Sequence, residues 1–291
     1  MKIDLHIHSN YSDDGEFTVK EILELSKKNH IEIISLTDHN SVRGIEEAIT
    51  YGKENHIEVI PGIEIDCIYN GLNLHLLGYG FDFTHEDYKI LEENVYQQEM
   101  KFAYEKIEKI SNHTDLIVDK DKILKQANGR IITGELIAEV IINNPENHKK
   151  SILLPYLEGG SRSDMPNVNF YWDFFSQGKI AYIPIEYISL KEAIDLIEGT
   201  GGIPVIAHPG NNLRNKENLI YKLIHEGIKG MEVYSSYHSD EQIDYFLSVA
   251  KEKGLFITCG TDFHGKNKPN IQLGYFKQSI DFQEIIRKLK G

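Results

Sequence analysis

Histidine and carboxylate side chains end several apolar runs of this sequence, and both are common metal ligands. Four stretches show the pattern: DLHIH from residue 4, LTDH from residue 36, AHPG from residue 207 and GTDFH from residue 260. Two more, PGIE from residue 61 and HLLG from residue 75, add one candidate ligand each. Because these stretches are far apart in the sequence, only a fold that gathers strand ends could unite them, and an alternating barrel of strands and helices does so. We therefore predict a metallohydrolase with several metal ions in one pocket.

The spacing within the stretches supports this prediction. His6 and His8 are two residues apart, so on an extended strand both side chains point to the same face and can bind one ion. Asp262 and His264 repeat this spacing after the final strand. A Pro-Gly pair turns the chain directly after His208, which would leave that imidazole at the barrel mouth.

The second group of candidates follows the first two strands. Asp13 and Asp14 lie in a loop before a glycine, where a turn aspartate is common, and only one of them need bind metal. We prefer Asp13, five residues after His8, and expect Asp14 to be solvated. Asp38 is expected to orient a histidine or to begin a helix, whereas His39 is expected to be a ligand.

Glu64 follows the third strand, and a carboxylate there can bridge two cations because each of its oxygens can bind one. His75 lies between two leucines and could instead be a core histidine held by one hydrogen bond. We take Glu64, Asp262 and His264 also as catalytic residues. The predicted metal ligands are His6, His8, Asp13, His39, Glu64, His75, His208, Asp262 and His264.

This set of ligands predicts the kind and number of the metal ions. Six histidines and three carboxylates suit manganese, iron or zinc better than magnesium or calcium, which prefer oxygen ligands. Nine ligands are too many for one ion, so we expect two or three divalent ions as cofactors. Together they would activate a bridging hydroxide and neutralise charge on a phosphate and its leaving group.

Composition narrows the class of protein. A chain of 291 residues with 41% hydrophobic content can bury one large core. The net charge of −14 argues against a long nucleic-acid duplex as partner, although bound cations would let a small phosphorylated substrate bind. No apolar run approaches the roughly 18 residues of a membrane helix, and no signal-peptide pattern opens the chain, so we expect a cytoplasmic protein. The oligomeric state is left open.

The order of predicted elements indicates an α/β fold with an insertion. Strands are expected at 3–5, 33–36 and 57–60, followed by a hairpin of 63–68 and 73–79 around Asn70-Gly71. Helices dominate near 86–111, 119–127 and 134–143, and 144–178 is irregular and aromatic. Alternation resumes with strands at 203–207, 230–234 and 255–259, and a helix is expected near 281–290. We predict a barrel domain formed by 1–83 and 179–291 and an inserted helical cap at 84–178.

Taken together, the stretches HIHSNYSDDG, LTDHN, GIEI, HLLGY, AHPG and GTDFHG resemble those of the polymerase and histidinol phosphatase (PHP) family of metal-dependent phosphoesterases, in the family's order. The resemblance implies a distorted, TIM-like barrel of seven strands. It also implies three metal ions, bound by three sets of ligands: His6, His8, Glu64 and Asp262; Glu64, His75 and His208; and Asp13, His39 and His264. The helical insertion resembles the branch that removes phosphate from nucleoside 3′,5′-bisphosphates, some members of which trim short RNA from the 5′ end.

Substrate contacts are expected from basic residues. Arg130 is the first candidate to bind a phosphate through two hydrogen bonds, Arg214 the second and Arg162 the third, although each could be an ordinary surface arginine. His238 follows a strand at the barrel mouth and could donate a proton or contact phosphate. The aromatic residues from Tyr171 to Phe175 could stack on a base, but more often such residues pack a cap.

The predicted function is thus hydrolysis of phosphomonoesters, on nucleoside 3′,5′-bisphosphates or the 5′ ends of short oligonucleotides. Within the same class, a histidinol-phosphate phosphatase is the alternative. An amidohydrolase-type deaminase also begins with two histidines two residues apart on a barrel strand, but it would have a different bridging group and a lone aspartate after the last strand. A non-catalytic metal-binding domain is disfavoured because every ligand position is intact.

Overall fold

The computed structural model describes residues 2–276 and residue 285 of the chain. They form two compact units. Among the described residues, the first contains 2–91, 187–264 and 271–276, and the second contains 92–186 and 265–270. The expected insertion at 84–178 overlaps most of the second unit, and the long helix α3 (Glu86–His113) belongs partly to each. Its role as a cap stays a prediction.

The first unit contains two β-sheets in the described part of the chain. The smaller sheet is parallel, in the order β1-β2-β3, and the larger has the order β6-β4-β5-β7-β8-β9. The strands are β1 (Ile3–Ile7), β2 (Ile33–Leu36), β3 (Glu58–Val59), β4 (Gly62–Tyr69), β5 (Leu72–Tyr79), β6 (Ile188–Ser189), β7 (Ile203–Ile206), β8 (Gly230–Ser235) and β9 (Phe256–Gly260). Every strand expected from the apolar runs is present, with ends shifted by a few residues.

The two sheets are linked where the candidate ligands lie. An isolated parallel bridge joins Ile7 at the end of β1 to Phe263 after β9, and another joins His39 after β2 to Glu64 on β4. Backbone hydrogen bonds reinforce both links, because the N–H of Asp262 donates to the carbonyl of His6 at 2.8 Å. The structure is therefore a mixed α/β fold with its sheets joined at both places, and a closed seven-stranded barrel stays a prediction.

The expected hairpin is confirmed. Strands β4 and β5 pair antiparallel from Gly62 opposite Tyr79 to Tyr69 opposite Leu72. Asn70 and Gly71 form the two-residue turn, with φ of 50° and 77°, as this turn type requires. The resulting alternation turns Glu64 and His75 toward the site.

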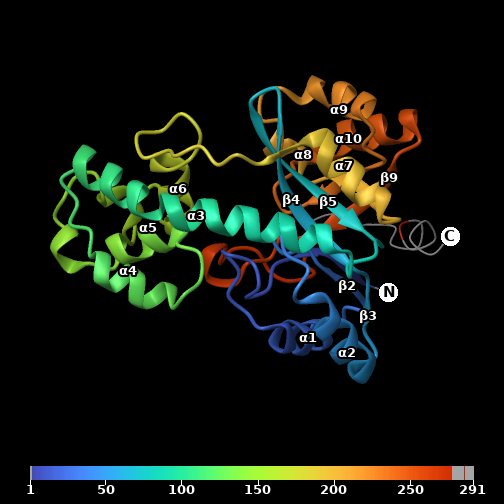
Figure 1. The fold of residues 1–291 in the computed structure, drawn as a ribbon, viewed down its shortest axis with the longest axis horizontal. Coiled ribbons are helices and arrows are strands. Elements are labelled where there is room, and N and C mark those ends of the chain that lie inside the picture. The colour runs from blue at the N-terminus through green and yellow to red at the C-terminus, as the bar shows by residue number, and fades with distance from the viewer. Residues whose placement is uncertain (1, 277–284, 286–291) are drawn as a thin grey trace. The chain divides into compact units, whose positions relative to one another are not determined.

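Helices with capping boxes flank the strands of the first unit. Thr18, Ser189 and Ser239 each cap a helix through a reciprocal pair with the residue three positions on, as their sequence pattern predicts. The helices are α1 (Val19–Lys28), α2 (Ile45–Asn55), α7 (Leu190–Gly199), α8 (Pro209–Asn212), α9 (Ile220–Glu226) and α10 (Asp240–Lys253), with a 3-10 turn at Glu217–Leu219. In Figure 1, α1 and α2 lie beside β2 and β3, and α7 lies beside β4 and β5. Helix α10 packs against β8 and β9.

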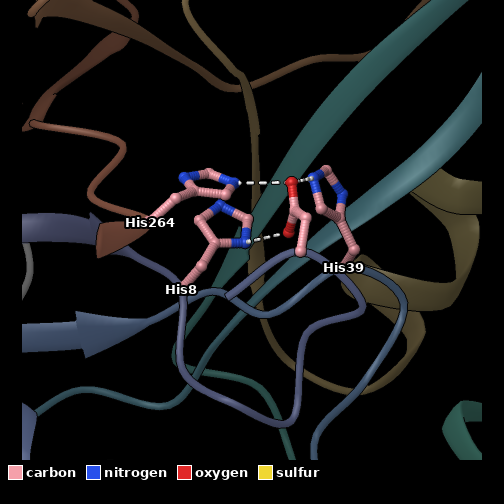
Figure 2. Close-up of side chains that lie close together, drawn as sticks. His8, His39 and His264 are labelled. Carbon is pink, nitrogen blue, oxygen red and sulfur yellow. Dashed lines mark ion pairs between the residues drawn. The ribbon is translucent and has the colours of Figure 1, made fainter. Parts of the chain in front are cut away.

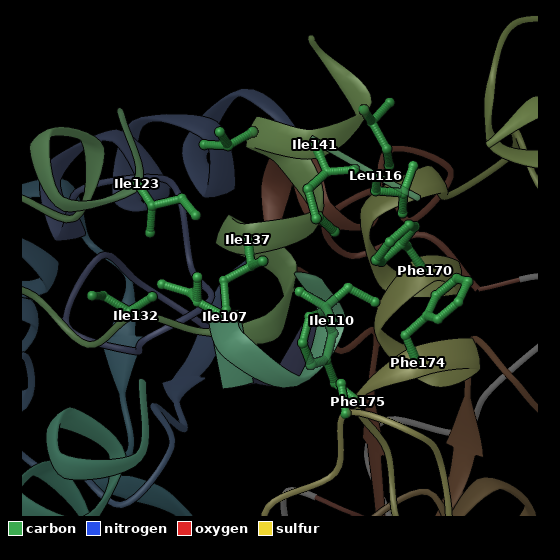
Figure 3. Close-up of a cluster of buried hydrophobic side chains, with 14 of the residues drawn as sticks. Ile107, Ile110, Leu116, Ile123, Ile132, Ile137, Ile141, Phe170, Phe174 and Phe175 are labelled. Atoms are coloured by element: carbon green, nitrogen blue, oxygen red, sulfur yellow. The ribbon is translucent and has the colours of Figure 1, made fainter. Parts of the chain in front are cut away.

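The second unit is helical and has its own hydrophobic core. Besides most of α3 it contains α4 (Lys120–Ala127), α5 (Gly134–Ile142) and α6 (Pro166–Phe174), with 3-10 turns at Pro145–Asn147, Leu154–Tyr156 and Gly265–Asn267. Figure 3 shows isoleucines of α3, α4 and α5 packing with Phe170, Phe174 and Phe175. The irregular reading of 144–178 was thus wrong for 166–174, where Pro166 at the first turn favours a helix. Two of the four aromatic residues proposed to stack on a base, Phe174 and Phe175, belong to this core.

Two remaining expectations concern the ends of the chain and the membrane. The helix expected near 281–290 lies outside the described residues, apart from residue 285. Among the residues that the structure describes, no helix combines the length and the apolarity needed to cross a bilayer.

Candidate metal centre

Eight of the nine predicted metal ligands come together in the first unit. Glu64 and His75 lie within the hairpin strands β4 and β5, whereas the other six lie at the end of β1 or in the segments after β1, β2, β7 and β9. The exception is Asp13, whose place is taken by its neighbour Asp14.

The first group of donors contains His6, His8, Glu64 and Asp262, all buried. The Nε2 atoms of the two histidines are 3.2 Å apart, and each lies 3.0 Å from Glu64 Oε2. Asp262 Oδ1 lies 3.3 and 3.2 Å from the same nitrogens. Ligands about 2.1 Å from one ion at angles of 90–110° are roughly 3.0–3.4 Å apart. The four donor atoms therefore have the spacing of one coordination shell.

Glu64 also faces a second pair of histidines through its other oxygen. His75 Nδ1 lies 3.0 Å and His208 Nε2 3.2 Å from Glu64 Oε1. One carboxylate thus presents one oxygen to His6 and His8 and the other to His75 and His208. This is the arrangement expected of a carboxylate that bridges two cations.

A further group is formed by His8, Asp14, His39 and His264. Figure 2 shows the three imidazoles turned toward one carboxylate, with Asp14 Oδ2 2.9 Å from His264 Nε2 and 3.9 Å from His39 Nε2. The geometry therefore favours Asp14 over the expected Asp13 as the carboxylate of this group. The loop after β1 is not extended, since the N–H of Ser12 donates to the carbonyl of Ser9, so counting residues from His8 did not identify the inward carboxylate.

Three of these histidines, whose Nε2 atoms face the centre, are oriented by hydrogen bonds to their Nδ1 atoms. Nδ1 of His8 lies 3.2 Å from the hydroxyl of Ser12, and Nδ1 of His264 lies 2.9 Å from the carbonyl of Asp262. Nδ1 of His6 is 2.9 Å from a carboxylate oxygen of Glu232. With the proton on Nδ1, each Nε2 lone pair points into the centre, as metal ligation requires. Ser12 and Glu232 were missed in the sequence, although a glutamate inside the apolar run GMEVYS was a visible signal.

The charges within the centre are strongly coupled. Burial would lower the pKa of His39, but Glu64, Asp66 and Asp14 outweigh it and raise that pKa to about 10. Burial would raise the pKa of Glu64, yet His6 and His75 hold it well below its usual value. His8 differs, because burial and the neighbouring His264 lower its pKa to about 4. The carboxylates of the centre thus favour the protonated form of His39 but do not offset burial at His8.

These residues fit divalent metal ions. Converging nitrogen and oxygen lone pairs at 3.0–3.3 Å repel one another unless a cation or a proton lies between them. The mixture of imidazole and carboxylate is the donor set of manganese, iron or zinc. Nδ1 of His208 is buried and has no hydrogen-bond partner among the described residues, so its orientation is set through Nε2 and the backbone.

The predicted substrate residues lie in different settings. Nδ1 of His238 lies 2.8 Å from the carbonyl of Val233, and its Nε2 accepts from the N–H of Gly210. Burial lowers the pKa of His238. Both ring nitrogens contact the backbone and support the turn after His208, and the expected contact with substrate stays a prediction. Arg214 belongs to the first unit and is exposed; its guanidinium donates to Asn211.

The arginines expected in the insertion both belong to the second unit. Arg162 forms an ion pair with Asp173 at 3.1 Å, and its side chain also reaches the carbonyl of Asn169. It is thus committed to holding the loop before α6. Arg130 is exposed, and its role in phosphate binding stays a prediction.

A comparison with protein families matches residues 4–142 to the PHP domain. The chain carries a PHP domain. The matched segment includes the ligands from His6 to His75, and the resemblance of the sequence motifs to this family is thereby confirmed.

Curated relatives match nearly the whole of this chain. The 3′,5′-nucleoside bisphosphate phosphatase of Chromobacterium violaceum is 27% identical over 94% of this chain and 90% of its own length. The 5′-3′ exoribonuclease Rnm of Escherichia coli is 26% identical over 93% of this chain and 87% of its own. A solved structure from C. violaceum, described as an amidohydrolase with bound sulfate, has a TM-score of 0.80 and 24% identity, covering 100% of this chain and 96% of that one. At this identity the last comparison shows the fold alone.

Proposed function

We propose that this PHP protein is a metal-dependent phosphoesterase that removes phosphate from small nucleotides, and first of all from nucleoside 3′,5′-bisphosphates. The observation that carries the proposal is the position of Glu64. Its two oxygens face two different pairs of histidines at 3.0–3.2 Å. Such a carboxylate can hold two cations close enough together to act on one phosphate.

Different groups of residues in the centre would hold different metal ions. His6, His8, Glu64 and Asp262 would hold one ion, and the group of Asp14, His39 and His264, with His8, would hold another; Glu64 with His75 and His208 offers a third position. When bound, such ions withdraw electrons from a phosphoryl oxygen and lower the pKa of water. Manganese, iron and zinc are the proposed metals.

The protein itself contributes charge, orientation and exclusion of water. Glu64, Asp262 and His264 are buried, so the electrostatic interactions among these proposed catalytic residues are stronger than they would be in bulk water. The hydroxyl of Tyr237 donates to Asp262 Oδ2 at 2.5 Å and fixes which of its oxygens faces His6 and His8.

Two relatives support the proposed substrate class. The bisphosphate phosphatase aligned over 94% of the chain supports a small nucleotide with two phosphates, and the net charge of −14 is unfavourable for a long duplex. A second candidate is trimming of short RNA from the 5′ end, which the exoribonuclease relative supports. Arg130 and Arg214 are the proposed contacts for the phosphate that is not cleaved.

The test is phosphate release by manganese-loaded protein from adenosine 3′,5′-bisphosphate, 5′-AMP, histidinol phosphate and a short 5′-phosphorylated RNA. We expect the bisphosphate to give the highest kcat/KM. Preference for the RNA would select the exoribonuclease, and preference for histidinol phosphate the biosynthetic alternative. Absence of release from all four by protein shown to contain metal would refute phosphoesterase function and favour an amidohydrolase.

A further inference from the structure

Glu232 is a fully buried carboxylate on β8, two residues from the strand's first residue. Its Oε1 lies 2.9 Å from Nδ1 of His6, and its Oε2 accepts a hydrogen bond from the backbone N–H of His208 at 2.7 Å. Each oxygen therefore serves a different candidate ligand, one on β1 and one directly after β7. A buried carboxylate needs such partners, because burying an unpaired charge is very costly.

Strand β9 would normally separate Glu232 from His6. The order of the larger sheet places β9 next to β8, and the segment after β9 bridges to β1. At Gly260 on β9, an added Cβ would lie 2.1 Å from the Cβ of His6 and 2.5 Å from Oε1 of Glu232. The glycine leaves a gap in the strand through which the carboxylate reaches the imidazole.

The contact decides which nitrogen of His6 is available. When Nδ1–H donates to Glu232, the lone pair is on Nε2, which is the atom that faces His8, Glu64 and Asp262. A charged acceptor also makes the imidazole a stronger ligand. The Nδ1 atom of His8, by contrast, lies 3.2 Å from the neutral hydroxyl of Ser12, and its nearest printed carboxylate oxygen, Asp14 Oδ1, is 4.0 Å away.

The second oxygen acts on the backbone of His208. This residue has φ of 21° and ψ of 63°, a conformation that a side chain other than glycine rarely adopts and that the surroundings must hold in place. Its N–H points to Glu232 instead of to a neighbouring strand. The same carboxylate therefore fixes the ring of one ligand and the main chain of another.

We propose that Glu232 is the positioning residue of the metal centre, which fixes the metal-binding tautomer of His6 and the backbone of His208 through the gap at Gly260. The inference rests on the metal ligation in the proposed function, but not on the phosphoesterase reaction. Its test therefore uses zinc alone, without substrate.

The first experiment is calorimetric titration of metal-free protein with zinc, comparing wild type with Glu232→Gln. The amide keeps the size of the side chain, but its oxygen can serve only one of the two N–H donors. With that oxygen at His208, its NH₂ faces Nδ1 of His6 and favours the wrong tautomer. We expect the tightest zinc site to weaken by about 10–100-fold.

Thr258→Val provides the matched control. Thr258 is buried on β9 opposite Glu232 in the strand register, and its hydroxyl has no hydrogen-bond partner among the residues described. Valine preserves its shape, so zinc affinity should stay within about twofold of wild type. Equal zinc affinity in Glu232→Gln and this control would overturn the proposal.

A second measurement separates positioning from a general loss of structure and works on the wild-type protein. In zinc-loaded protein labelled with ¹⁵N-histidine, the Nδ1 proton of His6 should exchange slowly with water and resonate far downfield, because it is buried against a carboxylate. A His6→Asn variant identifies the signal. In folded Glu232→Gln this signal should move upfield or vanish while that of His264 stays. A wild-type His6 that carries its proton on Nε2 would refute the inference even if the variant failed to fold.

Discussion

Replacing Asp14 by asparagine should remove one metal ion from the centre and leave the rest. Asp14 supplies the single carboxylate of the group it forms with His8, His39 and His264, so the change removes that group's whole negative charge. The group of His6 and His8 keeps both Glu64 and Asp262. We therefore expect a selective loss rather than collapse of the site.

The size of the effect follows from the contact. Asp14 Oδ2 is 2.9 Å from His264 Nε2, within the distance expected for two ligands of one ion. Burial would raise the pKa of Asp14, but His264 and His39 hold it well below its usual value, so the carboxylate is charged at neutral pH. Loss of a residue that is hydrogen-bonded to a metal ligand, without itself touching the metal, typically weakens metal binding by 10–100-fold. Loss of a direct ligand should exceed the upper figure, which corresponds to about 2.8 kcal/mol.

The assay is metal content per chain after gel filtration, together with zinc titration of the metal-free protein. Asp13→Asn is the matched control, because it makes the same change of charge one residue away in the same loop. Its affinity should fall by less than about threefold. Loss of metal in Asp13→Asn with none in Asp14→Asn would refute the assignment, and loss of every ion in Asp14→Asn would refute the division into groups.

Three other predictions follow from the same geometry. Glu64→Gln should lose metal at more than one position and lower kcat/KM by at least roughly 100-fold, measured by metal content and phosphate release; full activity would exclude a bridging role. Metal-free protein should become less stable between about pH 6.5 and 10, because His39, whose pKa is raised to about 10, binds a proton in the folded state that the unfolded chain has lost. Thermal melting across this range checks the sign, and His39→Gln should flatten the dependence. Asn212→Ala should lower the free energy of unfolding by about 1–3 kcal/mol, since Asn212 donates to the carbonyls of His75 and Ala207 and accepts from the N–H of His75. Urea unfolding measures this change. The control is Asn211→Ala, which should lower the free energy of unfolding by less, because the Asn211 side chain accepts from the exposed Arg214.

Local chemistry made much of the architecture predictable. Apolar runs located the strands, and capping residues such as Thr18 and Ser189 located helix starts, because capping depends on residues only three positions apart. The turn at Asn70-Gly71 fixed the register of the hairpin and hence the direction of Glu64 and His75. The helix at 166–174 was missed although Phe170 and Phe174 have the i, i+4 spacing of one helix face. So short a helix depends on packing in the second unit for its stability.

The choice between Asp13 and Asp14 could not be made from the sequence. Both have the same chemistry, and a turn in the loop decided which carboxylate points inward. The surroundings of His238 could not be predicted for a related reason. Its position after β8 suggested exposure at the barrel mouth, whereas both ring nitrogens are hydrogen-bonded to backbone groups of Val233 and Gly210.

The sequence by itself determined the types of the candidate ligands and the resemblance to the PHP family, since each depends on residues a few positions apart. Tertiary structure alone decided which atoms meet. Glu64 shares its oxygens between two pairs of histidines because β1, β4, β5 and the end of β7 converge there. Glu232 reaches His6 only because Gly260 on an intervening strand has no side chain. Contacts between residues more than 200 positions apart depend on how strands are ordered in space, and no local pattern in the sequence contains that order.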